Sequence, residues 1–251
     1  MIIIKSKSEL EVMKEAGRIS ARALRIACES AKPGMSTAEV DSIAEEVIRA
    51  EGAIPAFLGY GGFPATICAS INDEVVHGIP SKHTKLREGD ILTVDVGAIF
   101  EGYVGDNANT VGIGHIDSES QRLIDVTRKG LYAGIAQAFL GNHLGDVSAA
   151  VGAVADEAGL GIVREYVGHG IGRDMHEDPN IPNYYDPSIG SGPLLRVGMC
   201  LAIEPMFNLG EDAVKTLRDG WTVVTRDHKY SAQIEHTIAI TEDGPVILTQ
   251  E

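Results

Sequence analysis

Cysteine is scarce in this chain, which carries only Cys28, Cys68 and Cys200. Their number is odd, and no two of them form a CxxC pair. A small secreted protein held together by disulfides needs an even and denser set of cysteines. The cysteine content therefore argues against a disulfide framework and suits a reducing compartment, so we expect a cytoplasmic protein.

Long hydrophobic runs are also missing. The amino-terminal stretch MIIIKSKSELEVM has only three isoleucines before charged residues begin, which is too short for the apolar region of a secretory signal peptide. No segment approaches the roughly 20 apolar residues that a membrane-spanning helix needs. We therefore expect neither a leader peptide nor a membrane partner.

Positive charge is the third scarce property. Lysine and arginine number 21 against 36 aspartates and glutamates, so the formal net charge is −15. An acidic surface repels a phosphate backbone, which argues against nucleic acid as a substrate. The chain would remain acidic even with two divalent cations bound. With so few basic residues, buried carboxylates have few cationic partners to pair with.

The remaining composition is that of an ordinary globular protein. Hydrophobic residues make up 44% and charged residues 23% of the 251 positions. A chain of this kind can bury a sizeable core, as one large domain or as two ordinary ones.

Capping patterns predict four helices. A serine followed three residues later by Glu or Gln is typical of a helix N-terminus, and glycine often follows the C-terminus. The predicted N-terminal caps are Ser8, Ser36, Ser118 and Asp146. The predicted ends lie near Ala31, Gly52, Gly141 and Gly159.

Strand-forming runs fall into two groups. They cover 64–70, 91–99 and 103–113, and then about 162–168, 199–207, 221–226 and 231–240. The order helix, helix, strands thus occurs twice, across 8–113 and 118–240, with no linker-like composition between the halves. We expect one α+β domain over residues 1–251, built as a structural duplication around a shared core. The segment 178–193, rich in Pro, Gly and Asn, is predicted to be a surface loop.

Two aspartates lie where a charge is costly. The run ILTVDVGAIFEGYVGD (91–106) has strand-forming flanks that would be buried on both faces, yet it contains Asp95 and Asp106. A two-residue turn at 101–102 would place both side chains on one face, as diagonal neighbours about 5–8 Å apart. Two bare carboxylates that close would repel each other, whereas divalent cations recruit such oxygen ligands.

The second half of the chain contains three comparable residues. Glu204 interrupts an apolar run, Glu235 occupies an inward position in QIEHTIAI, and His169 is flanked by glycines in GHGIG. Each alone has an ordinary explanation, as a salt-bridged core carboxylate or a structural histidine. Four acidic residues and one histidine, all on predicted strands, together indicate a metal centre.

Six motifs extend this pattern along the chain. They are NDEVVHGIP (72–80), VDVGAIFEGYVGD (94–106), YVGHGIGRDMHEDP (166–179), AIEPM (202–206), DGWTVVT (219–225) and SAQIEHTIAI (231–240). Through them the sequence resembles type I methionine aminopeptidases, M24-type metallopeptidases of the pita-bread fold, across essentially its whole length. The resemblance implies two pseudo-symmetric halves around a central curved antiparallel sheet.

The resemblance also implies a dinuclear metal site on the five residues already singled out. Asp106 and Glu235 would bridge the two ions, Asp95 would complete one site, and His169 with Glu204 would complete the other. Four carboxylates and one imidazole suit Co, Mn, Fe or Zn.

The implied reaction is hydrolysis of the N-terminal peptide bond, which removes initiator methionine from nascent chains whose second residue is small. Glu204 would carry a proton from the attacking water to the leaving amine. His77 would contact the scissile amide nitrogen, and His176 would steady the oxyanion. The other histidines are expected to be structural; they are His83, His115, His143, His228 and His236.

A pocket for the methionine side chain is implied as well. Its walls would be Tyr60, Phe63, Cys68 and Trp221, with Phe57 and Met175 as additional walls and His77 and His176 facing the substrate. Aromatic edges favour sulfur by only about 0.3–1.5 kcal/mol, so shape would dominate the fit. For any one of these aromatics, ordinary core packing is the alternative explanation.

Two other functions fit part of the pattern. X-Pro aminopeptidases and prolidases share the fold but usually carry a large extra N-terminal domain, whereas the first helix predicted here begins at Ser8. Non-catalytic binding proteins on the same scaffold tend to lose metal ligands, and all five are present here. We expect a monomer, and we expect any transient contact with ribosomes to use the catalytic domain.

Overall fold

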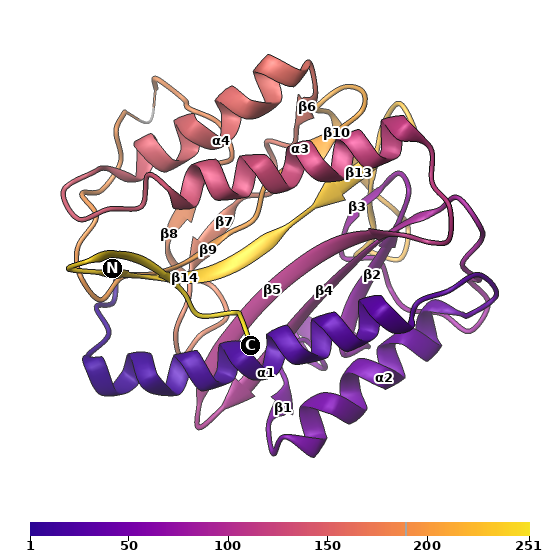
Figure 1. The fold of residues 1–251 in the computed structure, drawn as a ribbon, viewed down its shortest axis with the longest axis horizontal. Helices are drawn as coiled ribbons and strands as arrows, with labels where there is room; N and C mark the ends of the chain where they lie inside the picture. The colour runs from indigo at the N-terminus through magenta and orange to yellow at the C-terminus, as the bar shows by residue number, and fades with distance from the viewer. Residues whose placement is uncertain (189) are drawn as a thin grey trace.

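Two pairs of helices lie on the same side of the molecule and cover one face of a curved sheet (Figure 1). The structure is a computed structural model, and it describes residues 1–188 and 190–251. In chain order the helices are α1 Lys7–Ser30, α2 Thr37–Ala50, α3 Ser118–Ile135 and α4 Leu144–Ala158. No helix within the described ranges is long and apolar enough to cross a lipid bilayer.

Mostly short strands make up the rest of the fold. In the described residues they are β1 Ile54–Pro55, β2 Ile67–Ile71, β3 Glu74–Val76, β4 Ile91–Phe100, β5 Tyr103–Gly112, β6 Gly161–Ile162, β7 Gly168–Gly170, β8 Glu177–Ile181, β9 Cys200–Ile203, β10 Met206–Asn208, β11 Val214–Thr216, β12 Val223–Thr225, β13 Ser231–Gln233, β14 Glu235–Thr241 and β15 Gly244–Ile247.

The main sheet follows the order β1-β4-β5-β14-β9-β7-β8, with β2 paired to β4 and β15 paired to β14. Neighbouring strands in this sheet are antiparallel. The pairing of β5 with β14 joins the strands of the first half of the chain to those of the second half. The two halves therefore share one continuous sheet.

Apolar side chains fill two clusters between the helices and this sheet. Ile19 of α1 and Ile48 of α2 pack with Val94 of β4. Leu131 of α3 packs in a second cluster that includes Leu201 of β9. Each helix pair thus covers its own part of the sheet. This arrangement supports the expected duplication, which we retain as a proposal.

The helix α1 lies directly against β5 because two glycines meet where they cross. A side-chain carbon built on Gly105 would lie 2.5 Å from the backbone nitrogen of Gly17. A larger residue at Gly105 could fit only if the helix moved away, since backbone atoms already fill that space. The contact keeps α1 close behind the strand segment that carries Asp106.

The predicted helix starts fare differently. The start of α2 is confirmed, with Ser36 as its N-cap. The start of α1 at Ser8 is wrong, because Ser6 is the N-cap and forms a capping box with Glu9. The same serine-to-glutamate spacing occurs in both registers, and Glu9 also accepts a hydrogen bond from the Tyr103 hydroxyl. That tertiary contact favours the earlier register.

The starts of α3 and α4 are also displaced from the predicted positions. Asp117 rather than Ser118 caps α3, because its carboxylate accepts a hydrogen bond from the amide of Ser120. Asp146 is the third residue of α4 rather than its cap, and its carboxylate accepts from the amide of His143. In both helices an acidic side chain satisfies a free amide of the first turn.

The end of α3 was predicted near Gly141, but the helix stops at Ile135. The chain then turns, and Phe139 lies against Gly244, the first residue of β15. The predicted ends of the other helices are confirmed to within about two residues, and Gly159 caps α4 in a left-handed conformation.

The hairpin of β4 and β5 is confirmed in detail. Phe100 pairs with Tyr103 across a turn formed by Glu101 and Gly102, both of which have positive φ angles. The predicted strands 162–168, 199–207 and 231–240 are each split in two. The strands β1, β3, β8, β11 and β15 were not predicted or lie largely outside the predicted ranges.

The predicted surface loop 178–193 is wrong in its first part. Strand β8 covers Glu177–Ile181 and pairs with β7, and the side chain of Ile181 is buried. The remainder contains turns, and position 189 lies outside the described residues.

Candidate active site and metal centre

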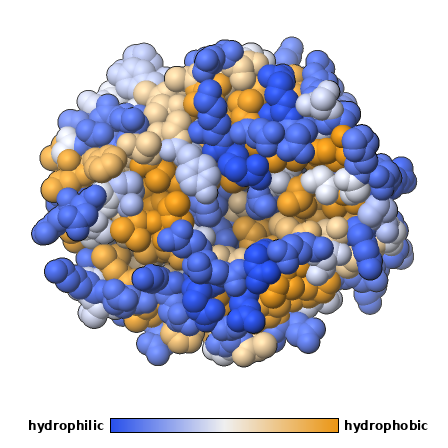
Figure 2. Space-filling model, viewed as in Figure 1, coloured by the Kyte–Doolittle hydropathy of each residue, from blue (hydrophilic) through white to orange (hydrophobic). Residues whose placement is uncertain are grey.

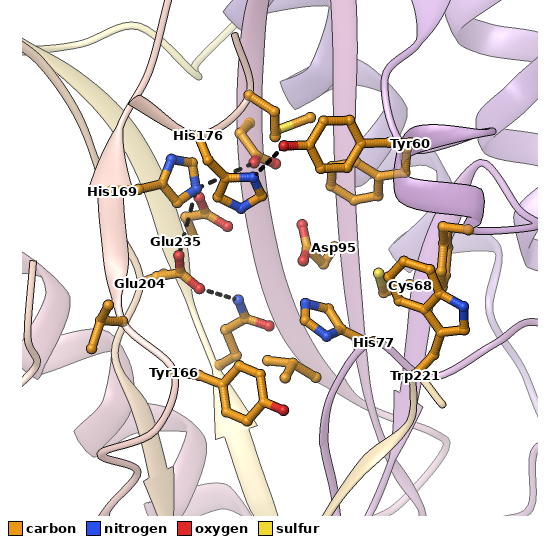
Figure 3. Close-up of a pocket in the computed structure, with 17 residues that line it drawn as sticks. Tyr60, Cys68, His77, Asp95, Tyr166, His169, His176, Glu204, Trp221 and Glu235 are labelled. Carbon is orange, nitrogen blue, oxygen red and sulfur yellow. Dashed lines mark hydrogen bonds and ion pairs between the residues drawn. The ribbon is translucent and has the colours of Figure 1, made fainter. Parts of the chain in front are cut away.

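A cavity of about 190 Å³ opens on the face of the sheet that the helices leave uncovered (Figure 3). Its position follows from strand geometry. Side chains alternate along β4, and Val94 and Val96 point into the cluster beneath the helices. Asp95 between them points the opposite way, into the cavity.

The structure brings every predicted site residue to this cavity. The expected metal ligands that line it are Asp95, Asp106, His169, Glu204 and Glu235. The expected catalytic and substrate-binding residues that line it are Phe57, Tyr60, Phe63, Cys68, His77, Met175, His176 and Trp221. Figure 3 shows Glu204 and Glu235 with His169 on one side, Cys68 and Trp221 on the other, and Asp95 between them.

The five expected ligands come from five strands that are neighbours in the sheet. Asp95 lies on β4, Asp106 on β5 and Glu235 on β14. Glu204 directly follows β9, and His169 lies at the middle of β7. Since the sheet order runs β4-β5-β14-β9-β7, each strand contributes one ligand-type side chain to a single row across the sheet.

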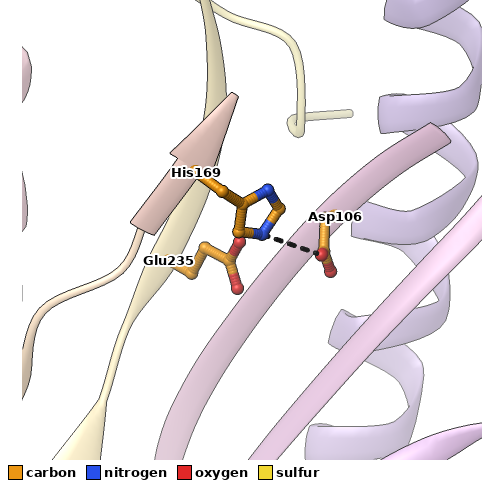
Figure 4. A group of neighbouring side chains, drawn as sticks. All are labelled: Asp106, His169 and Glu235. Carbon is orange, nitrogen blue, oxygen red and sulfur yellow. Dashed lines mark ion pairs between the residues drawn. The ribbon is translucent and has the colours of Figure 1, made fainter. Parts of the chain in front are cut away.

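The strand register explains how the acidic residues meet. Asp95 and Glu235 both pair with Ala108, while Asp106 pairs with Gly97. Asp95 and Asp106 are therefore diagonal neighbours on the same face, as predicted. Ligand atoms of Asp106, Glu235 and His169 all lie within 4.8 Å of one another (Figure 4).

His169 is oriented by its own backbone. Its Nδ1 donates a hydrogen bond of 2.9 Å to the carbonyl oxygen of Gly170. The other ring nitrogen, Nε2, then faces Asp106 at 3.9 Å and Glu204 at 3.7 Å. Burial, with a contribution from nearby His176, lowers the pKa of His169 to about 4. A neutral imidazole with a fixed tautomer suits metal ligation.

The carboxylates of this site are buried without compensating cations. Asp95, Asp106 and Glu235 are each at most 9% exposed, and an oxygen of each lacks a hydrogen-bond partner. None of the described residues that line the cavity is a lysine or an arginine. Burial raises the pKa of Asp95 to about 7 and raises the pKa values of Asp106, Glu204 and Glu235 well above their usual range.

Whether metal ions fit this site can be judged from its uncompensated negative charge and from its donor atoms. Neighbouring carboxylates add to the effect of burial on Asp106, Glu204 and Glu235, so the cluster is costly as a set of free anions. Oxygen donors together with one neutral imidazole form a donor set that divalent transition metals bind. The residues present therefore fit the expected metal centre.

Two further histidines face the cavity beside the carboxylates. Nδ1 of His176 lies 2.8 Å from the hydroxyl of Tyr60, and its ring centroid lies 4.3 Å from that of His169. His77 follows β3 with a positive φ of 59°, which turns its ring into the cavity (Figure 3). Burial lowers the pKa of both rings, that of His77 to about 4, so both are neutral near pH 7.

The rest of the cavity wall is aromatic and sulfur-bearing. The rings of Phe63 and Trp221 meet edge to face at a centroid distance of 5.1 Å. Phe57 and Met175 converge over Gly97 of β4, where an added side-chain carbon would lie 2.9 Å from the Phe57 ring. Burial raises the pKa of the Cys68 thiol well above its usual range, which suits a wall of the cavity better than a nucleophile.

Four wall residues were not predicted; they are Val76, Tyr166, Val167 and Gln233. The amide of Gln233 donates to Oε2 of Glu204 at 3.0 Å. A local signal for Gln233 was available, since it lies two residues before Glu235 in the motif SAQIEH. Tyr166 could have been predicted as a wall residue because it lies three residues before His169 in the motif that begins with YVGHGIG. None of the five histidines expected to be structural lines the cavity in the described part of the chain.

A second cavity, of about 440 Å³, lies on the opposite face of the sheet. It opens between α1 and α3, where the surface is hollowed (Figure 2). Arg25, Arg128 and Tyr132 lie at its walls, and none of the predicted site residues does. The predicted chemistry is therefore gathered in the first cavity.

Comparison with known proteins gives the family. The sequence profile of metallopeptidase family M24 matches residues 11–242. The chain belongs to this family. A methionine aminopeptidase of Clostridium acetobutylicum is 52% identical over 249 residues, which cover 99% of each chain. Methionine aminopeptidase 1 of Bacillus subtilis is 50% identical over 250 residues, which cover 100% of each chain.

Solved structures agree with this assignment and confirm the predicted α+β pita-bread fold. The methionine aminopeptidase of Thermotoga maritima superposes with a TM-score of 0.97 at 46% identity, and the match covers 100% of both chains. The prolidase of Pyrococcus furiosus superposes with a TM-score of 0.79 at 24% identity. This match covers 99% of the present chain and 66% of the prolidase chain. The second likeness shows a shared fold only.

Proposed function

We propose that this protein is a methionine aminopeptidase that removes initiator methionine from polypeptides whose second residue is small. The observation that carries the proposal is one cavity in which a row of metal-ligand side chains adjoins an aromatic, sulfur-lined compartment. The names of its full-length relatives support the same activity.

The metal centre is proposed to hold two divalent cations of Co, Mn, Fe or Zn. Asp106 and Glu235 would be shared between them, Asp95 would complete one site, and His169 with Glu204 would complete the other. Bound ions of this kind lower the pKa of water and polarise a peptide carbonyl. M24 membership supports the use of divalent metal, and the unmatched carboxylates support the choice of residues.

Glu204 is proposed to move the proton. Its Oε2 is held by Gln233 and its Oε1 lies near His169, so the carboxyl group is fixed at the edge of the cavity. From there it would take a proton from the attacking water and pass it to the leaving amine.

His176 is proposed to donate a hydrogen bond to the developing oxyanion. The ring is neutral, so only one nitrogen carries a proton. If the Tyr60 hydroxyl donates to Nδ1, then Nε2 must carry that proton and can donate to the substrate. His77 would contact the scissile amide nitrogen from the other side of the cavity.

The aromatic compartment is proposed to hold the methionine side chain. Phe57, Phe63, Cys68 and Met175 are buried and leave a space without charged groups, whereas Tyr60 is half exposed at its mouth. The fit would therefore select a long, flexible, apolar side chain. The low cysteine content further supports a protein that acts in the cytoplasm on nascent chains. A monomer, with any ribosome contact made by this same domain, stays a prediction.

Methionine release from a Met-Ala-Ser peptide tests the proposal. The chelator-stripped protein is assayed with and without Mn or Co, and an Ala-Pro peptide is assayed beside it. We expect metal-dependent cleavage of Met-Ala-Ser alone. Cleavage of Ala-Pro alone would assign the protein to the proline-specific enzymes. Binding of metal without cleavage of either peptide would make it a binding protein.

A further inference from the structure

The segment that carries His176 has little regular structure of its own. Residues 171–176 connect β7 to β8 and belong to no strand or helix. Within the described residues, the only hydrogen bond recorded for the His176 ring is the one to Tyr60. Backbone hydrogen bonds with Cys200 and Val104 tie only Ile171 and Gly172 to neighbouring strands. Other contacts must therefore position residues 173–176.

A buried ion pair lies behind the segment. Nζ of Lys5 contacts Oε2 of Glu177, and the two side chains are only 3% and 4% exposed. Every other pair of a lysine or arginine with an acidic side chain in the described residues is far more exposed. Neither Lys5 nor Glu177 lines the cavity.

Glu177 connects the middle of the segment to its end. It directly follows His176 and pairs with Gly170 in the β7–β8 register. Its second oxygen, Oε1, accepts a hydrogen bond of 3.1 Å from the backbone nitrogen of Arg173. One carboxylate thus joins Arg173 to the residue that follows His176.

Lys5 connects this carboxylate to the sheet. The backbone nitrogen of Lys5 donates a 2.8 Å hydrogen bond to the carbonyl of Gly198, two residues before β9. The pair also packs directly on the segment, since a side-chain carbon on Gly172 would lie 2.4 Å from both Oε1 of Glu177 and Cε of Lys5. The ammonium is therefore held in place by backbone that continues into the strand before Glu204.

Stability alone does not explain a charged pair at this place. Removing two charges from water costs so much that buried ion pairs can often be replaced by apolar residues without loss of stability. What an ion pair adds is a defined geometry, because the carboxylate must satisfy the ammonium and the Arg173 amide together.

We infer that Lys5 and Glu177 are positioning residues: their buried ion pair holds residues 173–176 so that the ring of His176 faces the reacting carbonyl. The inference rests on the proposed function, because it presumes that His176 acts on a substrate. It assigns a role in the reaction to residues that do not touch the substrate.

A double-mutant cycle with His176 tests this role. The variants are Lys5→Met and Glu177→Gln, each made in the wild type and in a His176→Ala background, with Lys7→Met as the exposed control. With Met-Ala-Ser as substrate, we expect Lys5→Met to lower kcat roughly ten- to hundredfold with little change in KM. In the His176→Ala background the same change should have almost no further effect. An equal loss in both backgrounds, or no loss in either, would overturn the inference.

A second measurement does not depend on activity. The imidazole resonances of His176, assigned by their loss in His176→Ala, are recorded in metal-free protein. We expect them to shift in Lys5→Met and to stay in place in Lys7→Met; unshifted resonances in Lys5→Met would overturn the inference. If wild-type protein fails to cleave Met-Ala-Ser, the proposed function fails and these resonances still test the positioning.

The Glu177→Gln variant covers the case in which Lys5→Met does not fold. It keeps an oxygen for the Arg173 amide and removes only the charge opposite Lys5. The same kcat ratio and the same resonances are then read from this variant, with the same outcomes expected.

Discussion

At the scale of single residues, the sequence was most informative where it broke the rule that inward positions of a buried strand are apolar. Asp95 is an acid in a strand whose neighbours are all buried, and Glu235 occupies an inward position in another. These violations pointed to the acidic metal ligands before any geometry was known, whereas His77, His176 and the pocket walls came from the resemblance. Gln233 was missed because a buried amide violates no such rule. Its place two residues before Glu235 was a weaker signal, and its contact with Glu204 shows that it belongs to the site.

Loss of one shared carboxylate should remove metal binding. Glu235→Gln keeps the shape of the side chain but lacks the negative charge and one strong acceptor. We expect metal affinity to fall by more than the roughly 10–100-fold that loss of a ligand's hydrogen-bond partner costs. Metal content after dialysis measures this, with Glu242→Gln in the exposed turn after β14 as control. Equal metal content in both variants would contradict the ligand assignment.

At the scale of elements, helix boundaries show what local pattern cannot decide. Ser6 and Ser8 both begin a serine-to-glutamate capping pattern, and the sequence holds no reason to prefer one. The choice is made by Tyr103, far along the chain, which donates to Glu9. The helix α3 is similarly cut short where Phe139 meets Gly244. Element type was predictable, whereas boundaries depended on contacts between distant segments.

The confirmed capping box of α2 gives a pH-dependent prediction. Hydrogen bonds from the Ser36 side chain and backbone, followed by the nearby Lys85 ammonium, lower the pKa of Glu39 from 4.5 to about 2. A lowered pKa means that the stabilisation is complete above about pH 4.5 and is lost as the pH falls through about 2. The melting temperature of wild type should therefore exceed that of Glu39→Gln near pH 7, and the difference should shrink towards pH 2.

A companion variant tests the cap without a charge. Ser36→Ala should lower the free energy of unfolding by about 1 kcal/mol, since it leaves a helix amide without its acceptor. Denaturant unfolding measures the change, and Ser42→Ala in the exposed middle of α2 is the matched control. A loss no larger than that of the control would show that the box contributes little.

At the scale of the whole molecule, the sheet order could not be derived from local pattern. The pairing of β5 with β14 joins Ala108 to Glu235 across about half of the chain. Strands as short as β1 and β7 carry too few residues for a period to be recognised. The curved antiparallel sheet was predicted only from the resemblance carried by the motifs. The residues alone predicted the order of helices and strands, a duplication around a shared core and the hairpin of residues 91–113.

Metal binding should stabilise the entire sheet. The proposed site draws ligands from four strands and from Glu204, which directly follows β9, so no unfolded segment offers the same set. An ion that binds only the folded state adds about 2.7 kcal/mol when its concentration is 100 times its Kd. We expect Mn or Co to raise the melting temperature of chelator-stripped wild type and to leave that of Glu235→Gln almost unchanged. Equal shifts in both would mean that the ions bind elsewhere.

The residues of the proposed site are divided between the two halves of the chain, so neither half contains all of them. Asp95 and Asp106 precede the exposed turn at Gly114, whereas His169, Glu204 and Glu235 follow it. A protein cut after Gly114 would thus leave one fragment with two acids and the other with three ligands, and neither could hold the full centre. Mixed fragments should regain peptidase activity in proportion to the product of their concentrations, so that hydrolysis would report the meeting of β5 with β14.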